Sequence, residues 1–260
     1  LYRSRVAGVP GPDNRLDRAR AELVLGGQAA TLPSAPGFWL RGSVAQLDVA
    51  AWQALAGRHA GQTPAFNLEW LRPVTLQVGH FQGFGLSAEN LGIRLQRQGP
   101  AWLVGLDSAL VDGQVTVPDQ AGAPLVLDFK RLNLPAPASS DAEAAAQPDA
   151  LADINPASLP ALDVSINQVL LGGEALGSST FKLRPVPAGV AISEMNLNLK
   201  GLQVTGNAGW TGPAGASQSW FKGRLQGADL GAVLQAWNYA PSVTSERFKV
   251  DADLRWPGSP

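Results

Sequence analysis

The sequence predicts a mostly β protein: a curved, twisted antiparallel sheet that forms an elongated open groove, with one or two short amphipathic helices. Three observations predict this fold. Short segments that alternate apolar and polar residues recur at intervals of about ten residues along most of the chain. Gly (29 residues) and Pro (20 residues) are abundant, as expected for many turns between short strands. Only two segments have convincing helical spacing.

The expected strands are short, β-branched or alternating, and bounded by Gly, Pro, Asn or Asp. In chain order they are 23–27, 37–44, 73–79, 90–96, 101–107, 113–118, 124–134, 162–171, 179–186, 189–200, 202–210, 219–227 and 247–256. Their close spacing predicts an antiparallel meander. The last strand, RFKVDADLRW, alternates almost without fault, so it has one apolar face and one charged face.

Two helices are expected, at about 48–57 and about 229–238. In the first, Asp48 is the N-cap and Trp52 lies on the apolar face. In the second, Asp229 is the N-cap and Asn238 ends the helix. The apolar face of the second helix consists of Leu230, Val233, Leu234 and Trp237.

A weak internal repeat accompanies these helices. A Trp-bearing strand leads to an Asp-capped helix twice, and residues 112–134 resemble residues 204–227 at an offset of about 93 residues. The pattern predicts about three β modules of roughly 90 residues each, stacked as an elongated structure.

The chain divides at a segment rich in Ala, Pro, Ser and Asp, residues 135–160. Residues 1–134 hold the first modules and residues 161–260 the next one. The segment itself is either an interdomain linker or a long insertion between adjacent strands of one sheet. The insertion is favoured because the strand pattern resumes at once.

Composition excludes several classes of protein. The net charge of −1 gives no reason to expect nucleic-acid binding. The absence of Cys excludes thiol chemistry and thiolate metal sites. No apolar run approaches the 18 or so residues of a membrane-spanning helix. The chain is interpreted as an internal fragment, so targeting signals are expected to lie outside it.

Signals of catalysis are poor, so no enzyme activity, cofactor or metal is expected. None of the common nucleotide, hydrolase or metalloprotease motifs occurs. His59 follows the first predicted helix, and a structural role is favoured for His80. Asp251 and Asp253 lie on one strand face, where alternating surface charge explains them better than an acid–base pair.

The apolar faces of the strands are the candidate site. Many strands have such a face, and only two short helices are available to cover them. The sheet either packs on a second sheet as a sandwich or curls into an apolar trough that needs an apolar guest such as an acyl chain. The residues expected from alternation to line the trough are Leu91, Ile93, Leu95, Leu125, Leu127, Phe129, Val164, Ile166, Phe181, Leu183, Met195, Leu197, Leu199, Phe248, Val250, Leu254 and Trp256.

Two other functions remain open. One is an assembly scaffold with closed β cores, whose sheet edges pair with strands of partner proteins. The other is a carbohydrate-binding module in which Trp39, Trp102 or Trp220 stacks on sugar rings.

Residues 223–260 resemble a segment of the AsmA-like family of Gram-negative envelope proteins, in its YhdP branch. The match runs through Asp229, Leu230, Gly231, Leu234, Tyr239, Ala240 and Pro241, and then through Leu254, Trp256, Pro257, Gly258 and Pro260. Asn238 replaces the usual Gly, and residues 42–55 resemble an upstream strand-to-helix element of the same proteins.

The resemblance implies a section of a periplasmic β groove in a protein anchored in the inner membrane by a helix outside this chain. Such proteins are implicated in moving phospholipid from the inner to the outer membrane. The expected partners are therefore phospholipid acyl chains, with both membranes contacted through parts outside the chain. An edge-strand dimer of the fragment is also possible, because cutting a groove exposes sheet edges.

Overall fold

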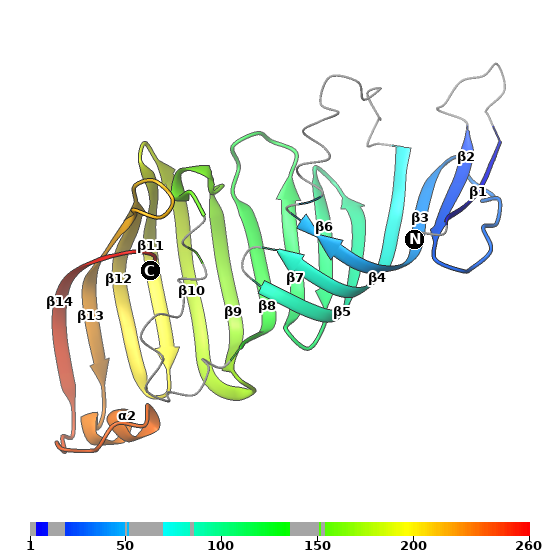
Figure 1. The fold of residues 1–260 in the computed structure, drawn as a ribbon. Coiled ribbons are helices and arrows are strands. Elements are labelled where there is room, and N and C mark those ends of the chain that lie inside the picture. The colour runs from blue at the N-terminus through cyan, green and yellow to red at the C-terminus, as the bar shows by residue number, and fades with distance from the viewer. Residues whose placement is uncertain are drawn as a thin grey trace. The chain divides into compact units, whose positions relative to one another are not determined.

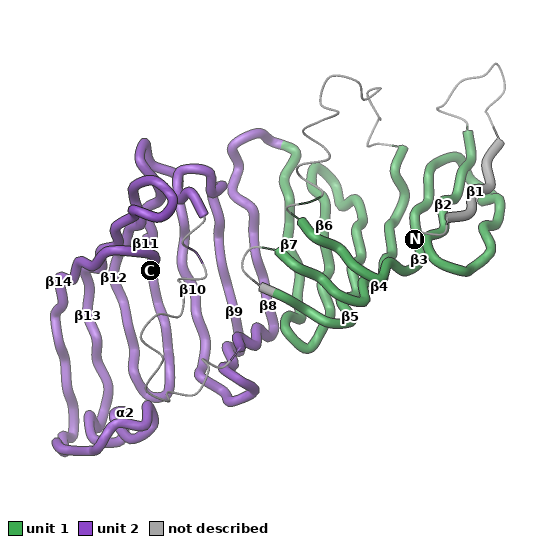
Figure 2. The backbone as a smooth tube through the Cα atoms, viewed as in Figure 1, with its two compact units in different colours: residues 1–119 green, residues 120–260 purple. Residues whose placement is uncertain are grey.

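The computed structural model describes residues 4–9, 19–49, 51, 70–83, 86–135, 151 and 154–260. The described part is mostly β, as predicted, and its helices include the α-helix α2 and the 3₁₀ helix η4 (Figure 1). The chain forms two compact units, residues 1–119 and residues 120–260 (Figure 2).

In the first unit, neighbouring strands of the sheet follow chain order. The strands are β1 (Ser4–Val9), β2 (Arg20–Leu25), β3 (Gly37–Asp48), β4 (Leu71–Gly83), β5 (Leu86–Gln98), β6 (Ala101–Asp107) and β7 (Val111–Pro118). β2–β3 and β3–β4 are parallel, and the other described pairs are antiparallel.

The second unit has the same serial order. Its elements are β8 (Leu125–Leu134), η4 (Pro156–Ser158), β9 (Leu162–Leu171), β10 (Glu174–Val186), β11 (Gly189–Leu199), β12 (Leu202–Thr211), β13 (Gln218–Gly227), α2 (Leu230–Ala236) and β14 (Phe248–Pro257). β8–β9 is parallel, and every later pair is antiparallel.

The three parallel pairs depart from the expected meander, and their connections explain why. A parallel pair needs a connection that returns the chain to the starting end of the sheet, which a tight hairpin cannot do. The connections here are residues 26–36, 49–70 and 135–161, which are long. Five strands, β4–β8, lie between the last two of these connections, and five more, β9–β13, follow before α2. The similar stretches 112–134 and 204–227 fall on the last two strands of each set of five.

The second predicted helix is present as α2, two residues shorter at its C-terminal end than expected. The Asp229 side chain accepts a hydrogen bond from the Gly231 N–H at 2.9 Å, which makes it the N-cap. Asn238 adopts a left-handed φ of 63°, and the Tyr239 N–H donates to the Leu234 carbonyl at 2.8 Å. This is the Schellman arrangement that ends many helices.

The first predicted helix lies mostly outside the described residues. Asp48 is the last residue of β3, and its side chain accepts a hydrogen bond from the Ala51 N–H at 3.1 Å, as an N-cap would. Trp52 and the residues up to Gly57 are not among the described residues.

Within each unit the sheet is open. In the described ranges, each strand makes its main contacts with its neighbours in chain order, and η4 packs on β10, β11 and β12. No second sheet covers either unit among these residues, so the described part is not a sandwich.

Candidate functional site

Strand register in the second unit brings the apolar residues onto one side of the sheet. Leu225 on β13 lies opposite Val204 on β12 and Val250 on β14. Directly paired residues in a sheet point to the same face, so these three side chains form a row that runs across the strands. We call this side the apolar face.

The apolar face consists of five such rows, each named after one residue on β11 or β12. From the Pro257 end of β14 to its Phe248 end they are the Trp210 row (Val190, Trp210, Ser219, Trp256); the Ile192 row (Leu125, Leu162, Leu183, Ile192, Ala208, Phe221, Leu254); the Met195 row (Leu127, Val164, Phe181, Met195, Gly206, Gly223, Ala252); the Leu197 row (Phe129, Ile166, Ser179, Leu197, Val204, Leu225, Val250); and the Leu199 row (Leu132, Val169, Gly177, Leu199, Leu202, Gly227, Phe248).

Every lining residue expected from alternation in the second unit lies in these rows. In the first unit, Leu91, Ile93 and Leu95 likewise share one face of their sheet, where they pair with Val78, Leu76 and Val74. The register establishes that the residues within each unit share a face. Their assignment as the lining of a lipid path stays a prediction.

A β-bulge keeps the apolar face continuous along β11. Ile192 pairs with Ala208 and Met195 with Gly206, so β11 has one residue more than β12 between these two pairs. Glu194 in this bulge adopts a left-handed φ of 50°, and the Lys182 ammonium binds its carboxylate at 2.7 Å. The extra residue changes the phase of alternation, so Met195, Leu197 and Leu199 all point to the apolar face.

The opposite face of the second unit is polar. The Arg224 guanidinium donates to the Asp251 carboxylate at 2.8 Å, and Lys222 lies 3.7 Å from Asp253. The Gln226 amide donates to the Gln203 side chain at 2.7 Å. The two aspartates are therefore paired with cations on the neighbouring strand, which supports the interpretation of Asp251 and Asp253 as surface charges.

The end of the apolar face near Trp210 is covered by the connection between β8 and β9. Leu183, Val190 and Trp210 are 7%, 1% and 3% exposed. The residues of the connection that pack against them are Leu151, Ile154 and Leu159. At the β14 edge, by contrast, Val250 and Leu254 are 51% and 52% exposed. The apolar face is thus covered at one place and open at another.

The covering segment is held in a defined conformation around η4. The Asn155 side chain accepts a hydrogen bond from the Ala157 N–H at 3.0 Å, and Ser158 donates from its hydroxyl to the Asn155 carbonyl at 2.7 Å. Pro156 is fully buried, and the Leu125 N–H donates to the Ala161 carbonyl at 2.9 Å. Residues 154–161 are therefore a packed element.

The apolar face of α2 lies over the turn between β11 and β12, at the end of the sheet where β13 stops and β14 starts (Figure 1). Val233 is buried beside Gly201 in that turn. The Lys200 ammonium lies 5.9 Å from the ring centre of Trp237, a cation–π distance. Leu230 and Leu234 are half-buried, so the predicted helix face is largely used in packing.

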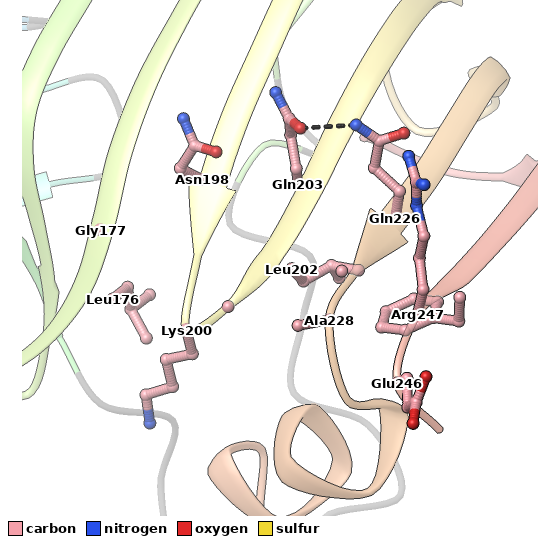
Figure 3. A pocket seen from close by; sticks show the side chains of 13 residues that line it. Leu176, Gly177, Asn198, Lys200, Leu202, Gln203, Gln226, Ala228, Glu246 and Arg247 are labelled. Atoms are coloured by element: carbon pink, nitrogen blue, oxygen red, sulfur yellow. Dashed lines mark hydrogen bonds between the residues drawn. The ribbon is translucent and has the colours of Figure 1, made fainter. Parts of the chain in front are cut away.

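A pocket of about 710 Å³ opens near the same end of the sheet (Figure 3). Its polar side chains include Asn198, Gln203, Gln226 and Arg247, which come from four strands or their ends. Gly177, Leu202, Gly227 and Phe248 of the Leu199 row also line it, so residues of both faces contribute to this pocket.

The other candidates for chemistry have structural environments. His80 contacts the Glu89 carboxylate through Nδ1 at 2.6 Å, whereas His59 lies outside the described residues. No group of three or more His, Asp or Glu side chains that could hold a metal occurs in the part of the chain that the structure describes. None of the helices found there is long and apolar enough to span a membrane.

The two tryptophans of the carbohydrate hypothesis that lie in the first unit do not share a face. Trp39 and Trp102 lie on opposite faces of the first unit. Trp102 is two residues from Val104, which pairs with Leu95, and Leu95 pairs with Val74, so Trp102 lies on the face of Val74. Leu40 pairs with Val74 and lies on that face too, so Trp39, the residue before Leu40, points to the opposite face. Trp220 is on the polar face of the second unit, where its indole lies against Gly209.

Glu22 is a charged group that the sequence analysis missed. The residue is 7% exposed, and its carboxylate accepts hydrogen bonds from the Arg41 guanidinium at 2.8 Å and the Thr31 N–H at 2.6 Å. These bonds, chiefly the one from Arg41, hold the pKa of Glu22 below its usual value. Because Thr31 lies in the connection between β2 and β3, the cluster fastens that connection to the sheet. No local signal in the strand RAELVL indicates this role.

The geometry of the second unit defines a class: β proteins whose open sheet carries an apolar face on one side and ion pairs such as Arg224–Asp251 on the other, with no metal cluster among the described residues. Comparison with the models of protein families assigns the chain to one family within this class. Residues 5–260 match the model of the family described as YhdP protein, so the chain belongs to the YhdP family of Gram-negative envelope proteins, which are generally not enzymes. No curated protein and no solved structure gives a significant match.

Proposed function

We propose that this chain is a section of a periplasmic conduit that carries phospholipid acyl chains between the inner and outer membranes without catalysis. The observation that carries the proposal is the apolar face: five rows of register-paired side chains, about half exposed at Val250 and Leu254, in a chain of the YhdP family. An ordinary monomer does not leave such a face to water, so the face needs an apolar guest.

The chemistry of the face suits an acyl chain. Its rows contain no charged side chain, whereas the ion pairs Arg224–Asp251 and Lys222–Asp253 lie on the other face. Each methylene transferred from water to such a surface contributes about 0.8 kcal/mol. Many weak and equivalent contacts would hold a lipid while letting it slide, because no single position is much more stable than the next.

The membrane contacts and the inner-membrane anchor of the proposed conduit would lie in parts of the protein outside this chain. Residue alternation gives no headgroup preference. The guest is therefore defined by its acyl chains.

Lipid extraction from the purified native protein tests the proposal. Leu225→Glu places a carboxylate in the middle of the Leu197 row, and Gln226→Glu places the same group one residue along on the polar face. Wild type and Gln226→Glu should co-purify with phospholipid, and Leu225→Glu should carry at least tenfold less, since a lone charge against hydrocarbon costs more than about 1.4 kcal/mol. If wild type carries no lipid, or both variants carry equal amounts, the proposal fails.

A further inference from the structure

The position of Leu151 and residues 154–160 on the apolar face has a consequence for the path of the lipid. This segment packs on Leu183 of β10, Val190 of β11 and Trp210 of β12, which are among the least exposed apolar residues of the unit. It therefore occupies part of the surface on which an acyl chain would lie. The covered part belongs to the Trp210 and Ile192 rows.

We propose that Leu151 and residues 154–160 form a fixed wall on the apolar face, so that acyl chains crossing β10–β12 are confined to the Met195, Leu197 and Leu199 rows. The inference rests on the proposed function and adds the location of the path. The described residues of the wall pack on Leu183, Val190 and Trp210, and none of these belongs to the three remaining rows.

The wall is anchored too well to act as a loosely held loop. Its three apolar side chains are partly buried against the cluster of Leu183, Val190 and Trp210, Pro156 is fully buried, and the backbone turns at η4 through hydrogen bonds to Asn155. Moving it would expose Trp210, Val190 and Leu183 together, and exposing each such side chain costs about 1.5–3 kcal/mol.

The three remaining rows are suited to a neutral, flexible guest. They contain aliphatic residues at Leu197, Val204 and Leu225, and glycines at Gly206 and Gly223, with no charged side chain. Rows two residues apart along a strand are separated by about 6.7 Å, so the band from the Met195 row to the Leu199 row spans about 13 Å. At the far edge of this band, α2 packs on the turn at Gly201.

Site-specific photo-crosslinking in the native protein, in cells of its own host, tests this location. On β11 the crosslinking residue replaces Leu197 in the open band, Ile192 beside the wall, or Asn196 on the polar face. On β12 it replaces Val204 or Ala208, which gives a second matched pair. Adducts are identified by mass spectrometry as phospholipid or as peptides of the same chain.

The inference predicts phospholipid adducts at Leu197 and Val204, at least tenfold fewer at Ile192, Ala208 and Asn196, and crosslinks from Ile192 into residues 151–162. Equal lipid yields at Ile192 and Leu197 would overturn the wall and leave the conduit standing. A crosslinking residue at Val250 is a further control. If it captured phospholipid while the residues at Leu197 and Val204 did not, the inferred band would also be wrong. Lipid at none of these positions would overturn the proposed function itself.

Discussion

Val250 on β14 lies directly opposite Leu225 on β13, and its side chain is 51% exposed. One residue further along, Asp251 lies opposite Arg224 and accepts a hydrogen bond from its guanidinium at 2.8 Å. A single strand pair therefore presents an aliphatic pair on one face and an ion pair on the other. The two faces can be perturbed separately by changing neighbouring residues.

The Arg224–Asp251 pair should contribute little to stability. Both side chains are largely exposed, and exposed ion pairs are worth about 0–1 kcal/mol. Asp251→Asn is therefore expected to change the free energy of unfolding by less than about 1 kcal/mol, and to leave co-purified lipid unchanged. Urea denaturation and lipid extraction measure the two effects. A large loss of lipid in this variant would mean that the polar face takes part in binding.

Trp210 should be the most sensitive position under the covering segment. It is 3% exposed, and replacing a buried Trp with Ala typically costs about 3–5 kcal/mol. Trp210→Phe should cost far less, because the indole Nε1 finds no hydrogen-bond acceptor among the described residues and a ring still fills the site.

Val250→Ala is the matched control for these two variants, since Val250 is already half exposed. Its expected cost is roughly 1 kcal/mol or less. Denaturation of the three purified variants, followed by circular dichroism, gives the comparison. If Val250→Ala and Trp210→Ala lowered the free energy of unfolding equally, the apolar face would not be covered at Trp210 and open at Val250.

The Glu22 cluster predicts a defined pH dependence. Its folded-state pKa lies below the unfolded value of 4.5, because Arg41 and Thr31 hydrogen-bond to the carboxylate. The cluster therefore contributes stability above pH 4.5 and loses it as the pH falls through the folded-state pKa. Glu22→Gln should lower stability at neutral pH and weaken this acid dependence.

Denaturation midpoints at neutral pH and at about pH 3 test the Glu22 prediction. Glu246→Gln, at an exposed carboxylate, is the control and should retain the acid dependence of wild type. If Glu22→Gln lost as much stability on acidification as wild type, another carboxylate would be responsible.

The contribution of each α2 cap to stability should be measurable separately. The Asp229 carboxylate accepts from the N–H groups of Gly231 and Ser245, so Asp229→Ala is expected to cost about 0.5–2 kcal/mol. Asn238 has a left-handed φ of 63°, so Asn238→Val should be destabilising and Asn238→Gly should not. Hydrogen exchange of the α2 amides reports both effects, and faster exchange in Asn238→Gly would contradict the Schellman assignment.

The sequence predicts the members of the apolar face well because alternation is a local property. A side chain's face follows from the residues two positions away, so the alternating residues within a strand, such as Leu125, Leu127 and Phe129, could be read without the fold. The rows across strands depend on the register and could not. Even the bulge leaves a local sign, since the apolar positions change phase between Ile192 and Met195. The cap of α2 at Asp229 and its end at Asn238 are local for the same reason.

The parallel pairs and the covering segment could not be predicted, because they depend on contacts distant in sequence. Whether a long connection returns to the starting end of a sheet is set by where it packs, and composition does not reveal this. Residues 135–160 are rich in small and polar residues, which suggests a loose loop, and yet Leu151, Ile154 and Leu159 dock on the sheet. Those three apolar residues were the available signal. The burial of Glu22 depends on Thr31 and Arg41 and has no such signal.

The central claim is that the apolar face holds acyl chains, and crosslinking at two neighbouring residues of β14 tests it most directly. A photo-crosslinking residue is placed at Val250 and, separately, at Asp251 in the native protein in cells, and attached lipid is identified by mass spectrometry. The account predicts phospholipid adducts at Val250 and none at Asp251, because the two side chains point to opposite faces. Crosslinks from Val250 only into protein, with no lipid at either position, would contradict it and favour a closed β core.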